Sequence, residues 1–288
     1  MKLKLKLMAA AVALVAASGA AQAAIATSTS GNGSLVLFAY DTSAHTTAMF
    51  DLGVEMDSFL PSAMSAGGSI TWNLGTSSVA GTGAYTGFSS TLNYGSTFAD
   101  FASASSVKWG VFALDSTGTA LGQDRVLSTS NTALATIKTQ TKANLTNFGP
   151  SQVDTFLAGH NLSVGQSSVA NGASLSSDPG VNAAANHSNG FGNSDKFRDK
   201  ATFVATAFAG TAQSFYMLDT NTGTLASTAL VTQFGNAAGN ATFLYNDTAG
   251  TLTFNQVAAI PEPSEYALML AGLGMLGFMA RRRLNNRA

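Results

Sequence analysis

The chain contains no cysteine and few charged residues. Without cysteine among its 288 residues, disulfide bonds and thiolate chemistry are excluded, and a domain of this size must be stabilised by apolar packing. Charged residues make up 10% of the chain, while Ser, Thr, Asn and Gly are abundant. This composition is typical of secreted β proteins, whose solvent-facing side chains are hydroxyls and amides, and it offers many sites for surface glycosylation.

Positive charge is scarce away from the two ends of the chain. Residues 24–260 contain seven Lys or Arg and thirteen Asp or Glu, a formal charge of −6, although the whole chain carries −1. Binding to nucleic acid needs clustered Lys and Arg. The charge balance therefore argues against a nucleic-acid partner.

The first 23 residues have the three parts of a secretory signal peptide. Three lysines within the first six residues form a basic n-region, residues 7–17 form an apolar h-region, and Ala21 and Ala23 form an A-x-A cleavage site. We therefore expect a signal peptide over residues 1–23, which signal peptidase removes after Ala23.

Residues 260–288 combine prolines, an apolar stretch and a run of arginines. Pro261 and Pro263 keep the chain extended around Glu262, because proline lacks an amide donor and the residue before it avoids the α region. A helix over residues 266–280 would span roughly 22 Å, less than the about 30 Å of a bilayer core. With the arginines at 281–283 held in the cytoplasm, the segment is expected to be a short or transient hydrophobic membrane helix.

A specific pattern of residues runs through this tail. Its members are Pro261, Glu262, Pro263 and Ser264, the apolar run 267–274, and Arg281, Arg282 and Arg283. This pattern resembles the PEP-CTERM sorting domain, which is also described as an ice-binding protein C-terminal domain. In that family an exosortase in the inner membrane of Gram-negative bacteria recognises the tail. The resemblance implies cleavage near Pro-Glu-Pro, release to the cell surface or extracellular matrix, and association with biofilm or exopolysaccharide.

Two other interpretations of the tail remain. One is an ordinary C-terminal membrane anchor that is retained. The other is a dinucleotide fingerprint, since Gly272, Gly274 and Gly277 match G-x-G-x-x-G. A true fingerprint follows a strand and precedes a βαβ unit, whereas this one follows Pro-Glu-Pro and ends near the C-terminus, so the glycines are better explained as small residues of a membrane helix.

The exported region, residues 24–259, mostly alternates apolar and polar residues with period two. Glycine-containing turns punctuate it, as at 219–223 and 246–250, and this combination predicts strands and hairpins. Ile70 and Trp72 share one strand face, and Trp109 lies on another. The sequence therefore predicts a mainly β fold, an antiparallel, jelly-roll-like β-sandwich.

A helical insertion interrupts the strands at about residues 131–160. Apolar residues from Leu134 to Phe148 recur at helical spacing, and residues 151–154 resemble a capping box for a second helix. We expect these helices to cover one end of the sandwich. Residues 163–193 are rich in Gly, Ser and Asn and predict a long, flexible, exposed loop.

Catalytic and metal-binding motifs are absent from the sequence. It contains no G-x-S-x-G elbow, Walker A pattern or H-E-x-x-H pair. His45, His160 and His187 lie far apart and are expected in loops. Asp51, Glu55 and Asp57 form the densest acidic cluster, which could supply oxygen ligands to Ca²⁺ or mark a strand end. We therefore predict no catalytic residue, no cofactor and no metal.

Aromatic and threonine residues suggest two kinds of binding face. Trp72 and Trp109 could form a carbohydrate platform, although aromatics at alternating strand positions more often face a core. An ice-binding face would need regularly spaced Thr-x-Thr rows, and the pairs at 220–222 and 251–253 share no period. Core positions are therefore expected for both tryptophans.

The sequence favours a non-enzymatic cell-surface or matrix protein with a structural or interaction role. Its expected partners are exosortase and the inner membrane, signal peptidase, and exopolysaccharide as the resemblance implies. A lectin-like module with exposed tryptophans is one alternative. A secreted hydrolase with a pair of carboxylates in a cleft is the other.

Overall fold

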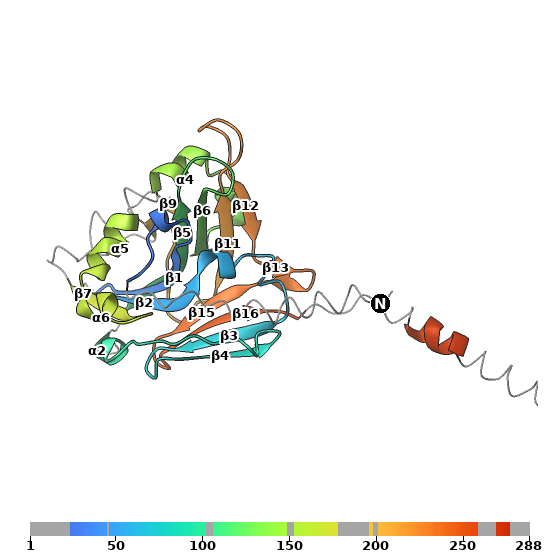
Figure 1. Cartoon of the computed structure of the whole chain (residues 1–288), viewed down its shortest axis with the longest axis horizontal. Helices are drawn as coiled ribbons and strands as arrows, with labels where there is room; N and C mark the ends of the chain where they lie inside the picture. Colours follow the sequence, from blue (N-terminus) through green and yellow to red (C-terminus); the bar gives the residue numbers. More distant parts are fainter. Residues whose placement is uncertain are drawn as a thin grey trace, which may run out of the picture.

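The computed structural model describes residues 24–44, 46–101, 106–148, 153–177, 196–197, 201–258 and 269–276, and the fold is mainly β (Figure 1). The strands are β1 (Ser34–Asp41), β2 (Thr46–Glu55), β3 (Gly68–Asn73), β4 (Ser78–Gly83), β5 (Val107–Ser116), β6 (Asp124–Ser130), β7 (Ala173–Ser177), β8 (Lys196–Phe197), β9 (Ala201–Ala205), β10 (Ala207–Phe208), β11 (Gln213–Asp219), β12 (Leu230–Gln233), β13 (Gly235–Asn236), β14 (Gly239–Asn240), β15 (Thr242–Asn246) and β16 (Thr251–Gln256). The helices are η1 (Ser28–Ser30), η2 (Met56–Ser58), α2 (Thr97–Phe101), α3 (Leu134–Ile137), α4 (Lys142–Phe148), α5 (Asp154–Asn161) and α6 (Val164–Ser167).

Twelve antiparallel strands form one curled sheet, a half-barrel. Ten of them follow the order β4-β3-β16-β15-β11-β6-β5-β1-β2-β7, with β10 on β5 and β12 on β11. Figure 1 shows the upright strands β5, β6 and β11 giving way to β16, β3 and β4, which run across the lower part of the molecule. The expected jelly-roll-like sandwich is not confirmed, because the hydrogen bonds connect these strands along one path instead of dividing them between two sheets.

Strand β1 lies in the middle of the fold and is buried on both faces. Its odd-numbered residues Leu35 and Leu37 belong to one apolar core, and its even-numbered residues Val36 and Phe38 belong to another. Successive strand residues point to opposite faces, so a fully apolar strand is needed where both faces are covered. Residues 35–40 of β1 are accordingly all apolar, and they are buried together with the polar residues at its ends, Ser34 and Asp41.

The first core fills the concave side of the curled sheet and is rich in aromatic rings. Phe59 follows η2 and lies at its centre, with its ring centroid 5.1 Å from that of Phe254 and 6.0 Å from those of Phe215 and Phe243. Trp72 is fully buried nearby and donates its indole N–H to the carbonyl oxygen of Leu52 at 3.0 Å. The sheet therefore curls around a plug supplied by a turn, and not by a second sheet.

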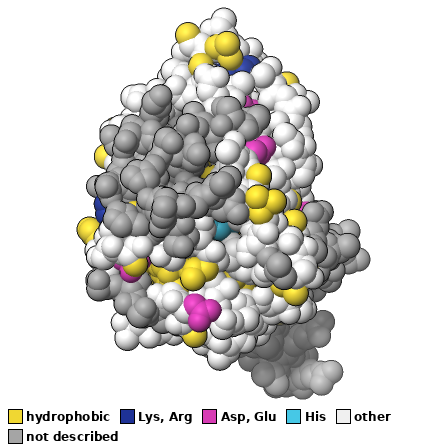
Figure 2. Space-filling model, turned by 90° about the vertical axis from the view of Figure 1, so that its left-hand side faces the viewer, with side chains coloured by type: hydrophobic (Ala, Val, Ile, Leu, Met, Phe, Trp, Pro, Cys, Tyr) yellow, Lys and Arg dark blue, Asp and Glu magenta, His cyan; other side chains and the backbone are white. Residues whose placement is uncertain are grey.

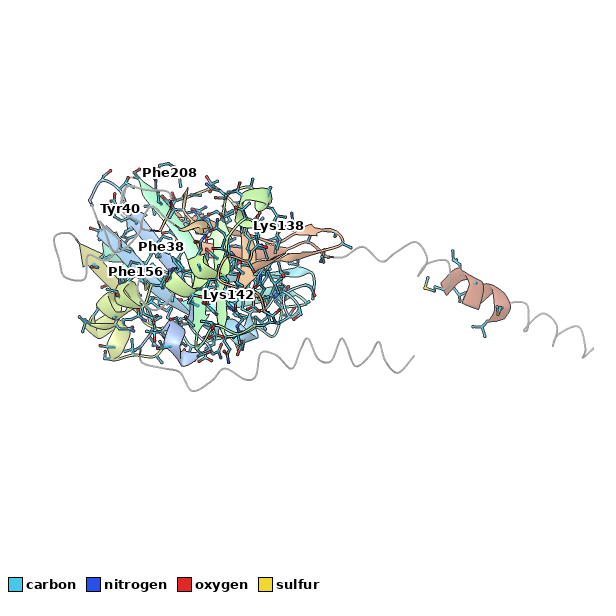
Figure 3. All side chains as sticks on the ribbon, turned by 90° about the horizontal axis from the view of Figure 1, so that it is seen from above. Phe38, Tyr40, Lys138, Lys142, Phe156 and Phe208 are labelled. Carbon is cyan, nitrogen blue, oxygen red and sulfur yellow. The ribbon has the colours of Figure 1, made fainter. Side chains whose placement is uncertain are left out.

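The second core lies on the convex side, beneath the helical insertion. Ile137, Leu145 and Phe148 are buried there, as their helical spacing predicts. Phe38 and Phe156, labelled in Figure 3, belong to this core. The segment predicted to be helical contains the short helices α3, α4 and α5, and it covers the convex face of the sheet.

Thr141 marks the break between α3 and α4. It forms a β-bridge with Thr228, and the amide of Lys142 donates to the carbonyl of Ser227 at 2.9 Å. These hydrogen bonds to another part of the chain replace those that would continue one helix. Helical periodicity thus predicted the buried face but not the interruption.

The predicted capping box at α5 is wrong. The N-cap is Val153, without a side-chain hydrogen bond, and the Asp154 carboxylate instead accepts from the amide and the hydroxyl of Ser28 at 2.8 and 2.7 Å. Asn161, at the other end of α5, pairs with both main-chain groups of Ile25 at 2.9 and 3.0 Å. Helix α5 therefore holds the N-terminal segment of the described chain in place.

The turn predictions hold better than the loop prediction. β15 and β16 form the expected hairpin through residues 246–250, and β11 pairs with β12 across a longer connection than the one predicted. The supposed loop at 163–193 contains α6 and β7 in its first part. Residues 178–193 lie outside the described part of the chain.

Candidate functional site

The predicted sorting and cleavage residues lie outside the described residues, in both terminal segments. They are Ala21, Ala23, Pro261, Glu262, Pro263, Ser264, Arg281, Arg282 and Arg283. Within the tail the structure describes residues 269–276, which are helical, with Met269 and Leu273 each 58% exposed. Among the described helices, none is long and apolar enough to cross a membrane.

Of the three histidines, His45 and His187 also lie outside the described residues. His160 is buried on α5, contrary to the loop position expected for it, and its Nδ1 lies 2.8 Å from the Oγ of Ser174 on β7. Burial lowers the pKa of His160 to about 4, so the ring is neutral at pH 7. Because Ser174 is also buried, this hydroxyl–imidazole pair joins β7 to α5 and is closed to a dissolved substrate.

The acidic cluster seen in the sequence does not converge in the structure. Asp51 is buried, Glu55 accepts a hydrogen bond from Asn32 at 2.5 Å, and Asp57 pairs with Arg125 at 2.7 Å. Over the residues that the structure describes, no group of three or more His, Asp or Glu side chains could hold a metal ion. The three acids thus make separate contacts, although Glu55 lies close enough to Asp51 to raise the pKa of that carboxyl.

Asp51 is an acid enclosed by the protein. Burial raises its pKa from 3.8 to about 7, while hydrogen bonds from the Gly53 amide and the Ser34 side chain lower it and Glu55 raises it further. Because the folded state binds the proton more tightly than the unfolded state, the free energy of unfolding falls as pH rises from about 4 to about 7.

We expect Asp51→Asn to remove much of this pH dependence, because asparagine is uncharged like the protonated acid. The wild-type protein should lose about 2 kcal/mol of unfolding free energy between about pH 5 and pH 7 through Asp51 alone. Asp124, whose pKa is raised to about 6, acts in the same direction. Urea unfolding at several pH values measures the slope, and Asp100→Asn, at an exposed acid, is the control. A slope shared by wild type and Asp51→Asn would contradict the prediction.

Among the residues that the structure describes, Arg125 organises the densest network of charges, and no motif predicted from the sequence contained it. Its Nε and Nη2 donate to Asp115 Oδ2 at 3.0 and 2.6 Å, and its Nη1 donates to Asp57 Oδ1 at 2.7 Å. Nη2 also donates to the carbonyl of Gly31 at 3.3 Å. The network therefore fastens two turns to the β5–β6 hairpin, which is a structural role.

The sequence did contain one signal for this network. Asp115 and Arg125 carry opposite charges only ten residues apart in the chain, and the structure places them directly opposite each other on β5 and β6. Opposite charges at facing strand positions stabilise a hairpin. Asp219, facing Arg125 from β11, extends the row by one strand.

A second buried charge lies beside this row. Lys142 on α4 donates through Nζ to the carbonyls of Asn221 and Gly223 at 3.1 and 3.4 Å. Nearby Asp124 is 1% exposed, and mainly burial raises its pKa to about 6. Lys142 thus anchors α4 to the β11–β12 connection, with the buried Asp124 close enough to interact with its charge.

Both tryptophans are core residues, as their alternation predicted. Trp72 and Trp109 are each 0% exposed, and the indole N–H of Trp109 donates to the carbonyl of Phe208 at 3.2 Å. A buried indole cannot stack on a sugar ring. The lectin-like alternative therefore loses the aromatic platform that it required.

Comparison with known proteins places the functional signal in the tail. Residues 259–283 match the family model of the PEP-CTERM protein-sorting motif. The tail is a PEP-CTERM sorting segment. The PEP-CTERM match spans the predicted Pro-Glu-Pro and arginine residues, and it marks the chain as an exosortase-targeted exported protein that passes through the membrane toward the cell surface. No curated protein and no solved structure matches the chain significantly.

Proposed function

We propose that residues 24–259 form a non-enzymatic structural or interaction protein of the cell surface or extracellular matrix. In this proposal a signal peptide is removed after Ala23, and an exosortase of a Gram-negative inner membrane cuts near Pro-Glu-Pro. The observation that carries the proposal is the PEP-CTERM match at residues 259–283. In this proposal the protein acts in a biofilm or in association with exopolysaccharide.

The described surface supports an interaction role that does not depend on clustered charge. Figure 2 shows scattered acidic and basic side chains on the face it presents. The most polar buried groups serve the fold, since Arg125 bridges Asp57 and Asp115, and His160 pairs with Ser174. Their use as structural links supports a non-catalytic role for the region around them.

Glu262→Gln is expected to stop processing if exosortase reads the acid between the two prolines. The intact mass of the protein from its native host should correspond to a chain that begins near Ala24 and ends near Pro263. The variant should instead keep its arginine run and remain in the membrane fraction, as should the wild-type chain in a host without exosortase.

Glu265→Gln is the matched control, because it removes the same charge just beyond the Pro-Glu-Pro motif. Its product should have the processed length. If the wild-type protein kept Arg281 to Arg283 in hosts with and without exosortase, the tail would be a permanent anchor and the proposal of release would be wrong.

A further inference from the structure

Strand β4 forms one edge of the large sheet. It pairs with β3 alone, in an uninterrupted antiparallel register from Gly68 opposite Gly83 to Asn73 opposite Ser78. Figure 1 shows β4 at the lower border of the molecule. One side of its main chain therefore has no neighbouring strand within the described part of the protein.

The main-chain groups of Val79 and Gly81 point away from the sheet. The amide of Leu74 donates to the carbonyl of Gly250 at 2.8 Å, so the even-numbered residues at this end of β3 bond to β16 and the odd-numbered ones bond to β4. Ala80, which faces Thr71 on β3, belongs to the bonded set. Its neighbours Val79 and Gly81 consequently present their amides and carbonyls outward.

This edge lacks the devices that usually protect one. Strand β4 reads Ser-Val-Ala-Gly-Thr-Gly, with no charge, no proline and no bulge, and such features normally block pairing with another chain. The opposite edge, β7, has α6 beside it, so close that a Cβ on Gly165 would lie 2.6 Å from the carbonyl oxygen of Ala173. Helix α6 thus covers the β7 edge of the sheet, whereas no helix or strand covers the β4 edge within the described part of the chain.

The convex face beside β4 also carries no charge. The outward positions alternate with buried ones on β3, β16 and β15 and with half-buried ones on β4. Cross-strand hydroxyl contacts join Ser69 to Thr82 at 2.8 Å and Thr71 to Thr253 at 3.3 Å. The twelve outward positions are Ser78, Ala80, Thr82, Ser69, Thr71, Asn73, Thr251, Thr253, Asn255, Thr242, Leu244 and Asn246. Two copies approaching here meet no like-charge repulsion.

We propose that β4 pairs with β4 of a second copy of this chain, antiparallel and around a two-fold axis at Ala80. In this register Val79 exchanges both main-chain hydrogen bonds with Gly81 of the other copy, and Gly81 with Val79. Ala80 faces Ala80, and Ser78 faces Thr82. The interface is the same patch on both copies, as a two-fold axis requires, and its small side chains allow close approach.

The chain around β4 limits the pairing to a short ladder. The carbonyl of Gly83 accepts from the amide and the hydroxyl of Thr86 at 3.4 and 2.6 Å, so the strand edge closes there. A Cβ on Gly81 would lie 1.7 Å from the carbonyl oxygen of Tyr85, so position 81 accommodates only glycine. A ladder of this length supports a weak dimer, which becomes populated where many copies are crowded on one surface.

Cysteine cross-linking tests the register, since the natural chain has no cysteine. At a facing position without main-chain bonds the two Cα atoms lie about 4.5 Å apart, within the range that a disulfide spans. Oxidation of the purified protein carrying Ala80→Cys should convert it to a covalent dimer of twice the mass. Thr253→Cys, on the same face but two strands from the edge, should remain monomeric.

A charge-swap experiment tests the same axis without a covalent bond. Sedimentation at rising protein concentration should show self-association of the wild-type protein and its loss in both Ala80→Lys and Ala80→Glu. Mixing the two variants should restore dimers, because unlike charges then face each other. Position 80 is exposed in the monomer, so circular dichroism should show an unchanged fold for both the Lys and the Glu variant.

Three outcomes would overturn the proposal. They are a monomeric Ala80→Cys protein, cross-linking of Thr253→Cys at the same rate, which would indicate stacking of the two faces, and no recovery on mixing the charged variants. These measurements use purified protein and do not depend on sorting. Failure of the edge pairing would therefore leave the proposal of exosortase processing intact.

Discussion

Replacing Phe59 with alanine is expected to lower the free energy of unfolding by about 4 kcal/mol, the usual range for a buried phenylalanine. The ring is fully buried. It contacts five other aromatic rings, those of Trp72, Phe215, Phe234, Phe243 and Phe254, with centroids 5.1 to 6.5 Å away. Because these rings come from segments far apart in the chain, the cavity left by alanine cannot close without moving the sheet.

Urea unfolding followed by tryptophan fluorescence measures the effect of Phe59→Ala, since Trp72 lies in the same core. Phe59→Leu should cost less, because it keeps most of the buried volume. Leu244→Ala, at a position 38% exposed on the convex face, is the control and should change stability by less than about 1 kcal/mol. Equal losses for Phe59→Ala and Leu244→Ala would show that the turn residue does not fill the half-barrel.

Arg125→Met is expected to lower the free energy of unfolding by about 3 to 5 kcal/mol, because it leaves a buried carboxylate without its partner. The Asp115 side chain is 2% exposed and receives two hydrogen bonds from the guanidinium. Arg125→Lys should also be destabilising, since an ammonium group cannot make the paired contact.

Two further variants separate the contributions in this network. Asp57→Asn should cost at most about 1 kcal/mol, because its side chain is 50% exposed and water screens the ion pair. The double variant Arg125→Met/Asp115→Asn should recover part of the loss, since the unpaired charge is gone. Additive losses in the double variant would mean that Asp115 and Arg125 do not act as a pair.

Alternation along the chain predicted which side chains face the core. Ile70, Trp72 and Leu74 share a strand face in the sequence and are all fully buried. Trp109 is buried in the same way. Such predictions succeed because period two is a local property of the strand. An apolar residue on the buried face packs into the core whichever strand pairs with its own.

Strand partners and strand edges could not be predicted in the same way. Period two assigns a residue to a face but says nothing of which distant strand will pair with it. A continuous curled sheet and a two-sheet sandwich therefore have the same pattern in sequence. The uncharged face over β3, β4, β15 and β16 was also hidden, because Thr251 and Thr253 become part of a regular array only when Asn73 and Thr71 lie beside them.

Polar residues were harder to assign than apolar ones. Asp154 has the position of a helix cap in sequence, but its carboxylate binds Ser28, 126 residues earlier. Arg125 follows Asp124 directly in the sequence, but its partner Asp57 lies 68 residues earlier and reaches it only through the folded turn. Hydrogen-bond partners that are distant in sequence leave no periodic signal, and for this reason the network was missed.

The pairing of β3 with β16 has a consequence for the time course of folding. Thr71 faces Thr253 across this ladder, 182 positions later in the chain. Folds dominated by such distant contacts form slowly, because a long loop must close before any contact compensates for the lost chain entropy. The sheet can therefore be completed only once β16, close to the end of the exported region, is available to pair with β3.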